Sequence, residues 1–150
     1  MHLKCSVEGA GEPAALSSVP LTAITPVRHL RILVIEDNHD AADSLRMLLE
    51  LDGHEVMVAY NGLAGIQAAT ACRPDVVLCD IGLPGLDGYG VVHALRHNPE
   101  TATLRIIAVT AYSQDSDRRR SREAGFDLHL TKPVDPYELL QKILSPPRAS

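Results

Sequence analysis

The chain has few aromatic residues and lacks the features that mark membrane and secreted proteins. Aromatic residues make up 3% of its 150 residues and tryptophan is absent, so a folded core has to be built from aliphatic side chains. No apolar stretch reaches the roughly 18 residues that a transmembrane helix needs. The N-terminus has no continuous apolar segment like that of a secretory signal. We therefore expect a cytoplasmic protein that makes no membrane contact.

Basic residues are also in deficit, which argues against a nucleic-acid partner. The chain carries 14 Lys and Arg against 19 Asp and Glu, so its net charge is −5. Nucleic-acid binding needs clustered positive charge to neutralise phosphates. Cysteine is scarce too, because only Cys5, Cys72 and Cys79 occur and their spacing fits no metal motif. What remains is ordinary for a globular protein, with 45% apolar and 22% charged residues.

Proline and glycine divide the chain into one domain and two tails. Residues 1–28 are punctuated by glycine and proline without any periodic pattern, which predicts a flexible N-terminal tail or linker. Residues 29–145 carry the periodic apolar segments of a folded domain. Residues 146–150 begin with two prolines and are expected to form a disordered C-terminal tail.

Within the domain, short apolar runs alternate with amphipathic segments. Five strands are expected, at 31–35, 54–59, 75–79, 105–109 and 128–130. Five helices are expected between and after them, at 40–51, 62–72, 87–96, 114–124 and from 135 onward. Asn38 and Asp87 suit helix N-caps, and Asp135-Pro136 is a strong helix start. This alternation predicts an α/β fold whose parallel sheet is covered by helices on both faces.

Polar residues follow these apolar runs, at the ends where a parallel sheet binds ligands. Glu36-Asp37 ends the first run, Asp80 the third and Thr110 the fourth, while Lys132 follows the fifth. Each of these residues alone would more often be an ordinary loop or strand-end residue. The carboxyl ends of parallel strands meet at one edge of the sheet, so together they predict one site. Three carboxylates, a hydroxyl and an ammonium suit a divalent metal ion and a phosphoryl group.

Four segments of the chain carry a recognisable pattern. They are Ile-Leu-Val-Ile-Glu-Asp-Asn (32–38), Asp-Ile-Gly-Leu-Pro-Gly-Leu-Asp-Gly (80–88), Val-Thr-Ala (109–111) and Leu-Thr-Lys-Pro (130–133). In this order, these segments resemble the receiver domain of bacterial two-component response regulators. The resemblance implies a doubly wound, flavodoxin-like α/β fold with five helices, whose five parallel strands lie in the order 2-1-3-4-5. It also implies a signalling module rather than an enzyme.

The resemblance assigns a role to each of these polar residues. Asp80 would be the phosphoacceptor, whose carboxylate attacks a phosphoryl group to give an acyl phosphate. Mg²⁺, or Mn²⁺ as its alternative, would be bound by Asp37 and Asp80 directly, by Glu36 through water and by the main-chain carbonyl of Gly82. The phosphoryl oxygens would be contacted by Lys132, the Thr110 hydroxyl and the backbone N–H of Ala111. Pro133 is expected to follow a cis peptide bond.

The resemblance also implies how a signal would leave the site. Thr110 would be drawn toward the phosphoryl group, and the family couples this movement to an aromatic residue on the fifth strand. Here that position is His129, a departure that puts the aromatic mechanism in question; a half-exposed edge histidine is an equal alternative. Gly82 and Tyr112 occupy positions that tune the lifetime of the phosphoryl group in the family.

Several alternatives stay open at the level of sequence. Arg118, Arg119, Arg120 and Arg122 form either a solvated helix face paired with Asp115, Asp117 and Glu123, or a surface for partner contact. A small phosphatase with an aspartyl nucleophile would need a second acid where Gly82 stands. A receiver-like module that binds partners without phosphorylation is the third alternative.

The partners follow from the resemblance. A histidine kinase or a histidine phosphotransfer protein would supply the phosphoryl group. A downstream protein would bind the face formed by the fourth helix, the fifth strand and the fifth helix. The chain would be either a stand-alone regulator or the receiver of a hybrid kinase, in which case residues 1–28 would be a linker.

Overall fold

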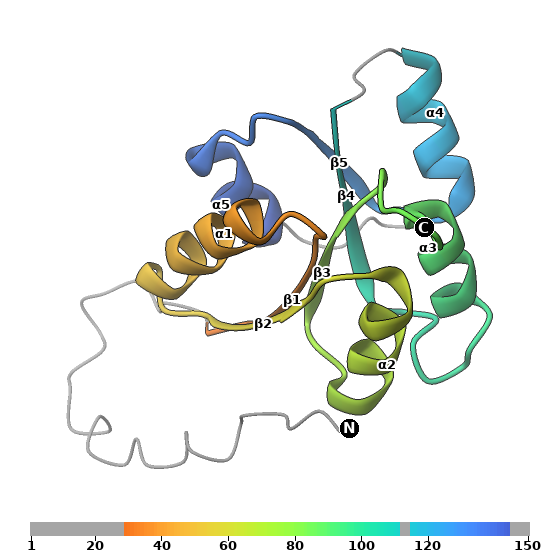
Figure 1. The fold of residues 1–150 in the computed structure, drawn as a ribbon, viewed down its shortest axis with the longest axis horizontal. Helices are drawn as coiled ribbons and strands as arrows, with labels where there is room; N and C mark the ends of the chain where they lie inside the picture. Colours follow the sequence, from red (N-terminus) through yellow and green to blue (C-terminus); the bar gives the residue numbers. More distant parts are fainter. Residues whose placement is uncertain (1–28, 112–114, 145–150) are drawn as a thin grey trace.

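The computed structural model describes residues 29–111 and 115–144. The expected tails at 1–28 and 146–150 lie outside the described residues, so this division of the chain stays a prediction. Within the described ranges, five strands alternate with five helices (Figure 1). None of these helices is both long enough and apolar enough to cross a lipid bilayer.

The strands form one parallel sheet in the order β2-β1-β3-β4-β5, which confirms the predicted order. All four pairings between neighbouring strands are parallel. Every carboxyl end therefore lies at the same edge, where the polar residues are expected. The strands are β1 (Arg31–Ile35), β2 (Glu55–Ala59), β3 (Val76–Asp80), β4 (Arg105–Thr110) and β5 (Leu128–Thr131).

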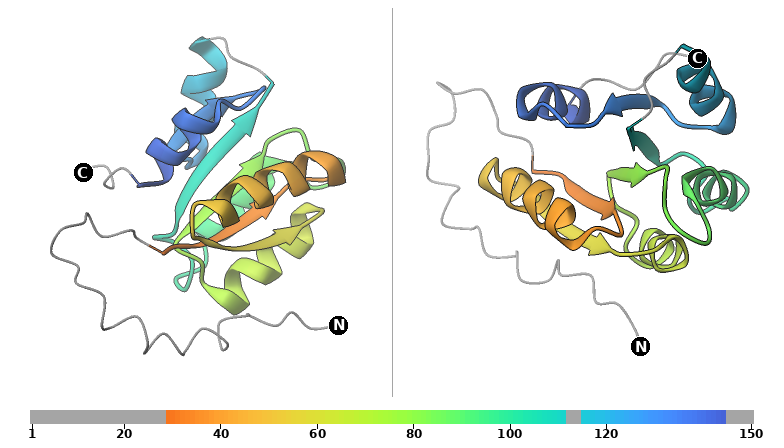
Figure 2. Two further views of the ribbon diagram at one scale, coloured as in Figure 1. Left: turned by 90° about the vertical axis from the view of Figure 1, so that its left-hand side faces the viewer. Right: turned by 45° about the horizontal axis from the view of Figure 1, so that its top comes forward.

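The helices cover both faces of the sheet. Helices α1 and α5 lie on one face, and α2, α3 and α4 lie on the other (Figure 2). The helices are α1 (His39–Leu51), α2 (Gly62–Cys72), α3 (Gly88–Arg96), α4 (Asp115–Ala124) and α5 (Pro136–Leu144).

The core consists of two aliphatic layers, one on each face of the sheet. Successive strand side chains point to opposite faces, so each strand contributes to both layers. Val34 of β1 packs in the layer with Leu49 of α1 and Leu139 of α5. Its neighbour Ile35 packs in the other layer, with residues of α2 and α3. Burial on both faces explains why the strands appear in the sequence as unbroken apolar runs.

Three helices, α1, α2 and α3, each begin with a side chain that caps the first turn. Each cap lies in the loop that joins the preceding strand to the helix. The side chains of Asn38, Asn61 and Asp87 accept hydrogen bonds from backbone N–H groups in the first turns of α1, α2 and α3. These bonds satisfy donors that a helix cannot satisfy internally. The sequence predicted the caps at Asn38 and Asp87, and the structure adds Asn61.

The element boundaries differ from the prediction by a residue or so. β2 begins at Glu55 because the N–H of His54 is bonded to Leu49 O, which keeps His54 in the turn after α1. Asp80 belongs to β3 because it pairs in register with Val109. Thr110 belongs to β4 and Thr131 to β5, since these two residues pair with each other. Residue 114, the expected start of the fourth helix, lies outside the described residues.

Candidate functional site

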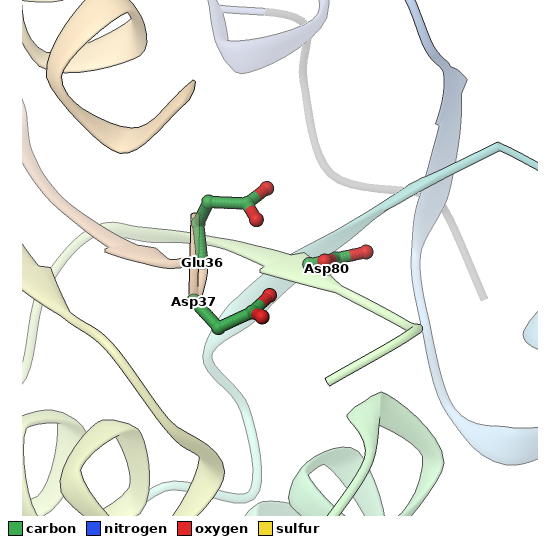
Figure 3. A group of neighbouring side chains, drawn as sticks. All are labelled: Glu36, Asp37 and Asp80. Carbon is green, nitrogen blue, oxygen red and sulfur yellow. The ribbon is translucent and has the colours of Figure 1, made fainter. Parts of the chain in front are cut away.

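Three carboxylates gather at the carboxyl edge of the two central strands. Glu36 and Asp37 follow the last residue of β1, and Asp80 is the last residue of β3 (Figure 3). β1 and β3 are neighbours, with Ile35 in register with Cys79, and this register brings the two chain segments together. The structure therefore assembles Glu36, Asp37 and Asp80 as the sequence predicted.

The acid trio, Glu36, Asp37 and Asp80, has a geometry that fits a small divalent cation. One carboxylate oxygen from each residue lies within 4.8 Å of the others. Mg²⁺ binds oxygen ligands at about 2.0–2.1 Å, so two ligands of one ion lie at most about 4.2 Å apart. Asp37 is exposed and can close the difference by a small rotation, whereas Glu36 and Asp80 are buried. An all-oxygen donor set with at least two negative charges suits this hard ion.

The ammonium group of Lys132 reaches the acid trio from the end of β5. Its Nζ lies 3.0 Å from Glu36 Oε1 and 3.5 Å from Asp80 Oδ2. The backbone N–H of Lys132 donates to Thr110 O at 2.8 Å, and this bond continues the pairing of β4 with β5 beyond the strand end. The Lys132–Pro133 peptide bond is cis, as the resemblance implied. The lysine thus joins an edge strand to the carboxylates of the central strands.

The protonation of Glu36 and Lys132 reflects burial and mutual attraction. Burial raises the pKa of Glu36, although hydrogen bonds from the N–H of Asn38 and from Lys132 favour its charged form. For Lys132, burial opposes the charged form, but the hydrogen bond to Glu36 and the charge of Asp80 outweigh it and raise the pKa. Lys132 is therefore a cation at neutral pH, placed between two carboxylates.

The two oxygens of Asp80 have different neighbours. The N–H of Gly82 donates to Oδ1 at 3.1 Å, while Oδ2 faces Lys132. A side chain at Gly82 would meet only Asp80 Oδ1, at 3.9 Å, so the space above the carboxylate is open. The chain passes much more tightly at Gly88, where an added Cβ would lie 2.7 Å from Asp80 O. Gly88 thus allows the first turn of α3 to pack directly on the end of β3.

The remaining predicted site residues lie on the neighbouring strands. Thr110 is buried at the end of β4, and Ala111 is exposed directly after it. His129 is half-buried on β5, opposite Ala108, and lines a groove between α4 and α5. Tyr112 lies outside the described residues. The direction of the Gly82 carbonyl toward a metal and the coupling of Thr110 to His129 stay predictions.

Sequence reasoning missed a second groove, which opens beside the acid trio. The α1 groove has a volume of about 400 Å³ and runs between α1 and the segment that follows β5. Glu36 and Lys132 lie at its end nearest the site. Its other walls are mostly apolar and are formed by Ala41, Ser44, Leu45, Leu48, Val109, Pro133, Val134 and Pro136. No local pattern could have revealed it, because its two walls are about 90 residues apart in the sequence.

Comparisons with known proteins agree with this geometry. The sequence model of the response regulator receiver domain matches residues 32–144. Protein PilH of Pseudomonas aeruginosa is 39% identical over 113 residues, which cover 75% of this chain and 93% of PilH.

Two solved structures extend the likeness to three dimensions. A putative response regulator from Chloroflexus aurantiacus superimposes with a TM-score of 0.73 at 34% identity, over 77% of this chain and 95% of that one. The receiver domain of a sensor histidine kinase from Pseudomonas aeruginosa, with a magnesium ion coordinated in its active site cleft, gives a TM-score of 0.72 at 30% identity. That alignment covers 77% of this chain and 95% of the other.

Proposed function

The chain belongs to the family of response regulator receiver domains, and we propose that it accepts a phosphoryl group on Asp80 from a phosphohistidine. One observation carries this proposal. Asp80 is buried at the centre of a cluster in which Lys132 Nζ lies 3.5 Å from one of its oxygens and two further carboxylates lie within 4.8 Å. Members of this family act in signalling together with histidine kinases or phosphotransfer proteins.

The attacking atom in this proposal is Asp80 Oδ2. Oδ1 accepts the hydrogen bond from Gly82, while Oδ2 faces Lys132, the cation best placed to meet the incoming phosphoryl oxygens. The Oδ2 lone pair forms a P–O bond as the P–N bond to the donor imidazole breaks in line with it. The bonding electrons leave with the imidazole nitrogen. The product is an aspartyl phosphate, and no oxidation or reduction takes place.

The neighbouring residues position and neutralise the transferred group. Lys132 would move from Glu36 to a phosphoryl oxygen, and the Thr110 hydroxyl and the Ala111 N–H would donate to the others. Mg²⁺, which the residues Glu36, Asp37, Asp80 and Gly82 would hold, supplies positive charge that offsets the charge of the phosphoryl oxygens. Without it, three acids and a phosphoryl group would repel one another, since Lys132 is a single positive charge.

Gly82 separates this proposal from the phosphatase alternative. A phosphatase of that kind needs a second acid two residues after its nucleophile, to protonate the leaving group. Glycine carries no acid, and among the described residues only Asp80 Oδ1 lies within 4 Å of the Cβ that a side chain at this position would add. We therefore propose transfer to Asp80 without a dedicated hydrolytic step.

The α1 groove is the proposed docking site for the phosphodonor. A donor protein has to bring its phosphohistidine next to Asp80, and this groove leads directly to Glu36 and Lys132. Its apolar walls suit a helix that presents apolar side chains on one face. Ser44→Arg would place a bulky cation in the groove, away from the acid trio, and is expected to slow transfer from a histidine kinase without slowing transfer from acetyl phosphate.

Intact-mass spectrometry tests the phosphoacceptor directly. We expect the protein with Mg²⁺ and acetyl phosphate to gain one phosphoryl group, and Asp80→Asn to gain none. Asp43→Asn is the matched control, because Asp43 is an exposed aspartate on α1 paired with Arg46. An adduct that persists in Asp80→Asn, or no adduct on the unaltered protein, would refute the proposal.

A further inference from the structure

The outer face of α3 carries two histidines one helical turn apart. The inner face of this helix is apolar, because Val91, Val92 and Leu95 are buried in the core. His93 and His97 are exposed. His97 is the C-cap residue, and its backbone N–H donates to His93 O at 3.1 Å. The helical spacing therefore continues to His97, and the two side chains lie on one side of the helix.

The two imidazole rings lie side by side. Their centres are 4.1 Å apart, and their planes are tilted by 33°. Zn²⁺ binds histidine nitrogen at about 2.0–2.1 Å, so two nitrogens of one tetrahedral ion lie about 3.4 Å apart. Both side chains are exposed and can bring one nitrogen each to this separation by small rotations. Two histidines four residues apart on a helix are a known arrangement for holding a metal ion.

A hydrogen bond prepares the His97 ring as a ligand. Its Nδ1 lies 2.8 Å from His93 O. A carbonyl oxygen only accepts, so Nδ1 carries the hydrogen, and Nε2 of the neutral ring has a free lone pair. Metal-binding histidines characteristically donate their second ring N–H to a carbonyl or carboxylate, which fixes the tautomer and the direction of the ring. His97 has this arrangement before any ion binds.

The donor atoms select a different class of ion from the acid trio. Neutral imidazole suits Zn²⁺, Ni²⁺ and Cu²⁺, whereas Mg²⁺ prefers oxygen. Among the described residues, the acid trio is the only group of three or more acidic, cysteine or histidine side chains that could hold a metal ion. The histidine pair thus supplies two ligands, and water can fill the other positions of an ion bound there.

The charged neighbours along the chain do not oppose a cation at this pair. Arg96 precedes His97, but its guanidinium group donates to Gly125 O and pairs with Asp127 at 2.9 Å. Glu100 follows three residues later and lies 3.5 Å from Arg73. Both cations are therefore balanced by a carboxylate.

We propose that His93 and His97 bind one Zn²⁺ or a similar late transition-metal ion, with water completing its coordination. This site goes beyond the proposed function and does not depend on phosphorylation of Asp80. It lies at the opposite end of α3 from Gly88, which packs against the backbone of Asp80. Nine residues of helix separate Gly88 from His97, a rise of about 13 Å. An ion on the pair would bridge the last turn of α3 and stabilise the folded chain.

Isothermal titration calorimetry of the full chain with ZnCl₂ tests the site. Excess Mg²⁺ is present throughout, so that the acid trio is offered the ion it prefers. We expect one Zn²⁺ per chain, and weaker binding of Mn²⁺ than of Zn²⁺. Imidazole ¹⁵N chemical shifts locate the ion, and we expect Zn²⁺ to shift Nε2 of His97 and one ring nitrogen of His93.

Single variants and a rearranged pair test the ligands. His93→Gln and His97→Gln are each expected to weaken Zn²⁺ binding at least about tenfold, because loss of even an outer partner of a metal ligand costs about 10–100-fold. The double variant His97→Asn with Asn98→His keeps the number of histidines but spaces them five residues apart, and the same loss is expected. His29→Gln alters an exposed histidine before β1 and is expected to change the affinity by less than about twofold. Unchanged affinity in the rearranged pair, or equal losses in all the variants, would overturn the proposal.

The remaining outcomes separate a metal site from other roles of the pair. If the His97 ring only caps the carbonyl of His93, His97→Gln lowers Tm in chelator, and Zn²⁺ raises Tm equally with and without the pair; that result would overturn the proposal. Zn²⁺ binding that Asp37→Asn abolishes and His93→Gln leaves unchanged would place the ion at the acid trio instead. One Zn²⁺ per two chains, with dimers in sedimentation that His93→Gln abolishes, would replace the water-completed site by one shared between two copies.

Discussion

Replacing Lys132 by methionine is expected to destabilise the protein through Glu36. Glu36 is 2% exposed, and Lys132 Nζ, 3.0 Å away, is the cation that balances its charge. Methionine keeps the apolar stem but leaves the carboxylate buried beside Asp80. Removing one partner of a fully buried pair costs about 3–5 kcal/mol. Lys132 itself is about one-third exposed, which reduces the expected loss to about 2 kcal/mol.

Urea unfolding with a chelator present measures this loss. With a slope of about 1.5 kcal/mol per M, a loss of about 2 kcal/mol lowers the midpoint by about 1.3 M. Lys142→Met is the matched control, because the Lys142 side chain is nearly as exposed as that of Lys132 but pairs with Glu138 at 3.9 Å on the surface of α5. That pair is worth at most about 0.5 kcal/mol.

The loss should depend on pH in a defined direction. The pKa of Glu36 is higher in the folded than in the unfolded protein, and it rises further without Lys132. Protonation therefore favours the folded state: this stabilisation is complete below the unfolded pKa and disappears as pH rises through the folded pKa. The difference between Lys132→Met and the unaltered protein is thus largest near neutral pH and shrinks as pH falls toward 4.5, the ordinary pKa of glutamate.

Two results would refute this reasoning. The first is a loss for Lys132→Met no larger than that for Lys142→Met. The second is a loss that stays constant from neutral pH to the acid range. Glu36→Gln provides the complementary check, because it removes the buried charge and is expected to recover most of the stability lost in Lys132→Met.

Three further variants test other parts of the structure. Gly88→Ala places a Cβ 2.6 Å from Ile81 Cα and is expected to lower the free energy of unfolding in urea by about 1–3 kcal/mol. Gly82→Ala is the control, because its Cβ meets nothing closer than 3.9 Å. Equal losses in the two variants would contradict the close approach at Gly88. Arg96→Met removes the hydrogen bonds to Gly125 O, Ala102 O, Leu104 O and Asp127 and is expected to cost about 2–3 kcal/mol, against less than about 0.5 kcal/mol for Arg46→Met. Asp37→Asn changes an exposed residue, so we expect its stability in chelator to equal that of the unaltered protein. We expect its Mg²⁺ binding to be at least about tenfold weaker, as measured by the Mg²⁺-dependent shift in Tm. A Tm shift equal to that of the unaltered protein would exclude Asp37 as a ligand.

The sequence predicted the sheet and the acid trio for the same reason. Apolar runs followed by Glu36-Asp37, Asp80, Thr110 and Lys132 place polar groups at the carboxyl ends of strands, and parallel topology brings those ends together. The order of the strands came from the resemblance and is confirmed. The predicted strands ended one residue short at Asp80, Thr110 and Thr131, because hydropathy falls at these residues while the backbone pairing continues.

Contacts between distant segments could not be predicted in this way. The pairing of Lys132 with Glu36 joins residues 96 apart, and nothing local to either residue identifies the other. Gly88 looked like an ordinary helix start after Asp87, and its close approach to β3 appears only when the chain is folded.

The position of Lys132 after β5 divides the proposed phosphoryl site into parts that we expect to differ in local stability. Glu36 and Asp80 are anchored by β1 and β3, which have a strand on either side. β5 is an edge strand of four residues that pairs with β4 alone in the sheet, so we expect it to open more readily than β1 and β3. Local opening of β5 would withdraw the Lys132 ammonium group and reshape the groove between α4 and α5 that His129 lines, while the acid trio stays assembled. We therefore expect the amide hydrogens of β5 to exchange faster than those of β1 and β3, which carry the acid trio.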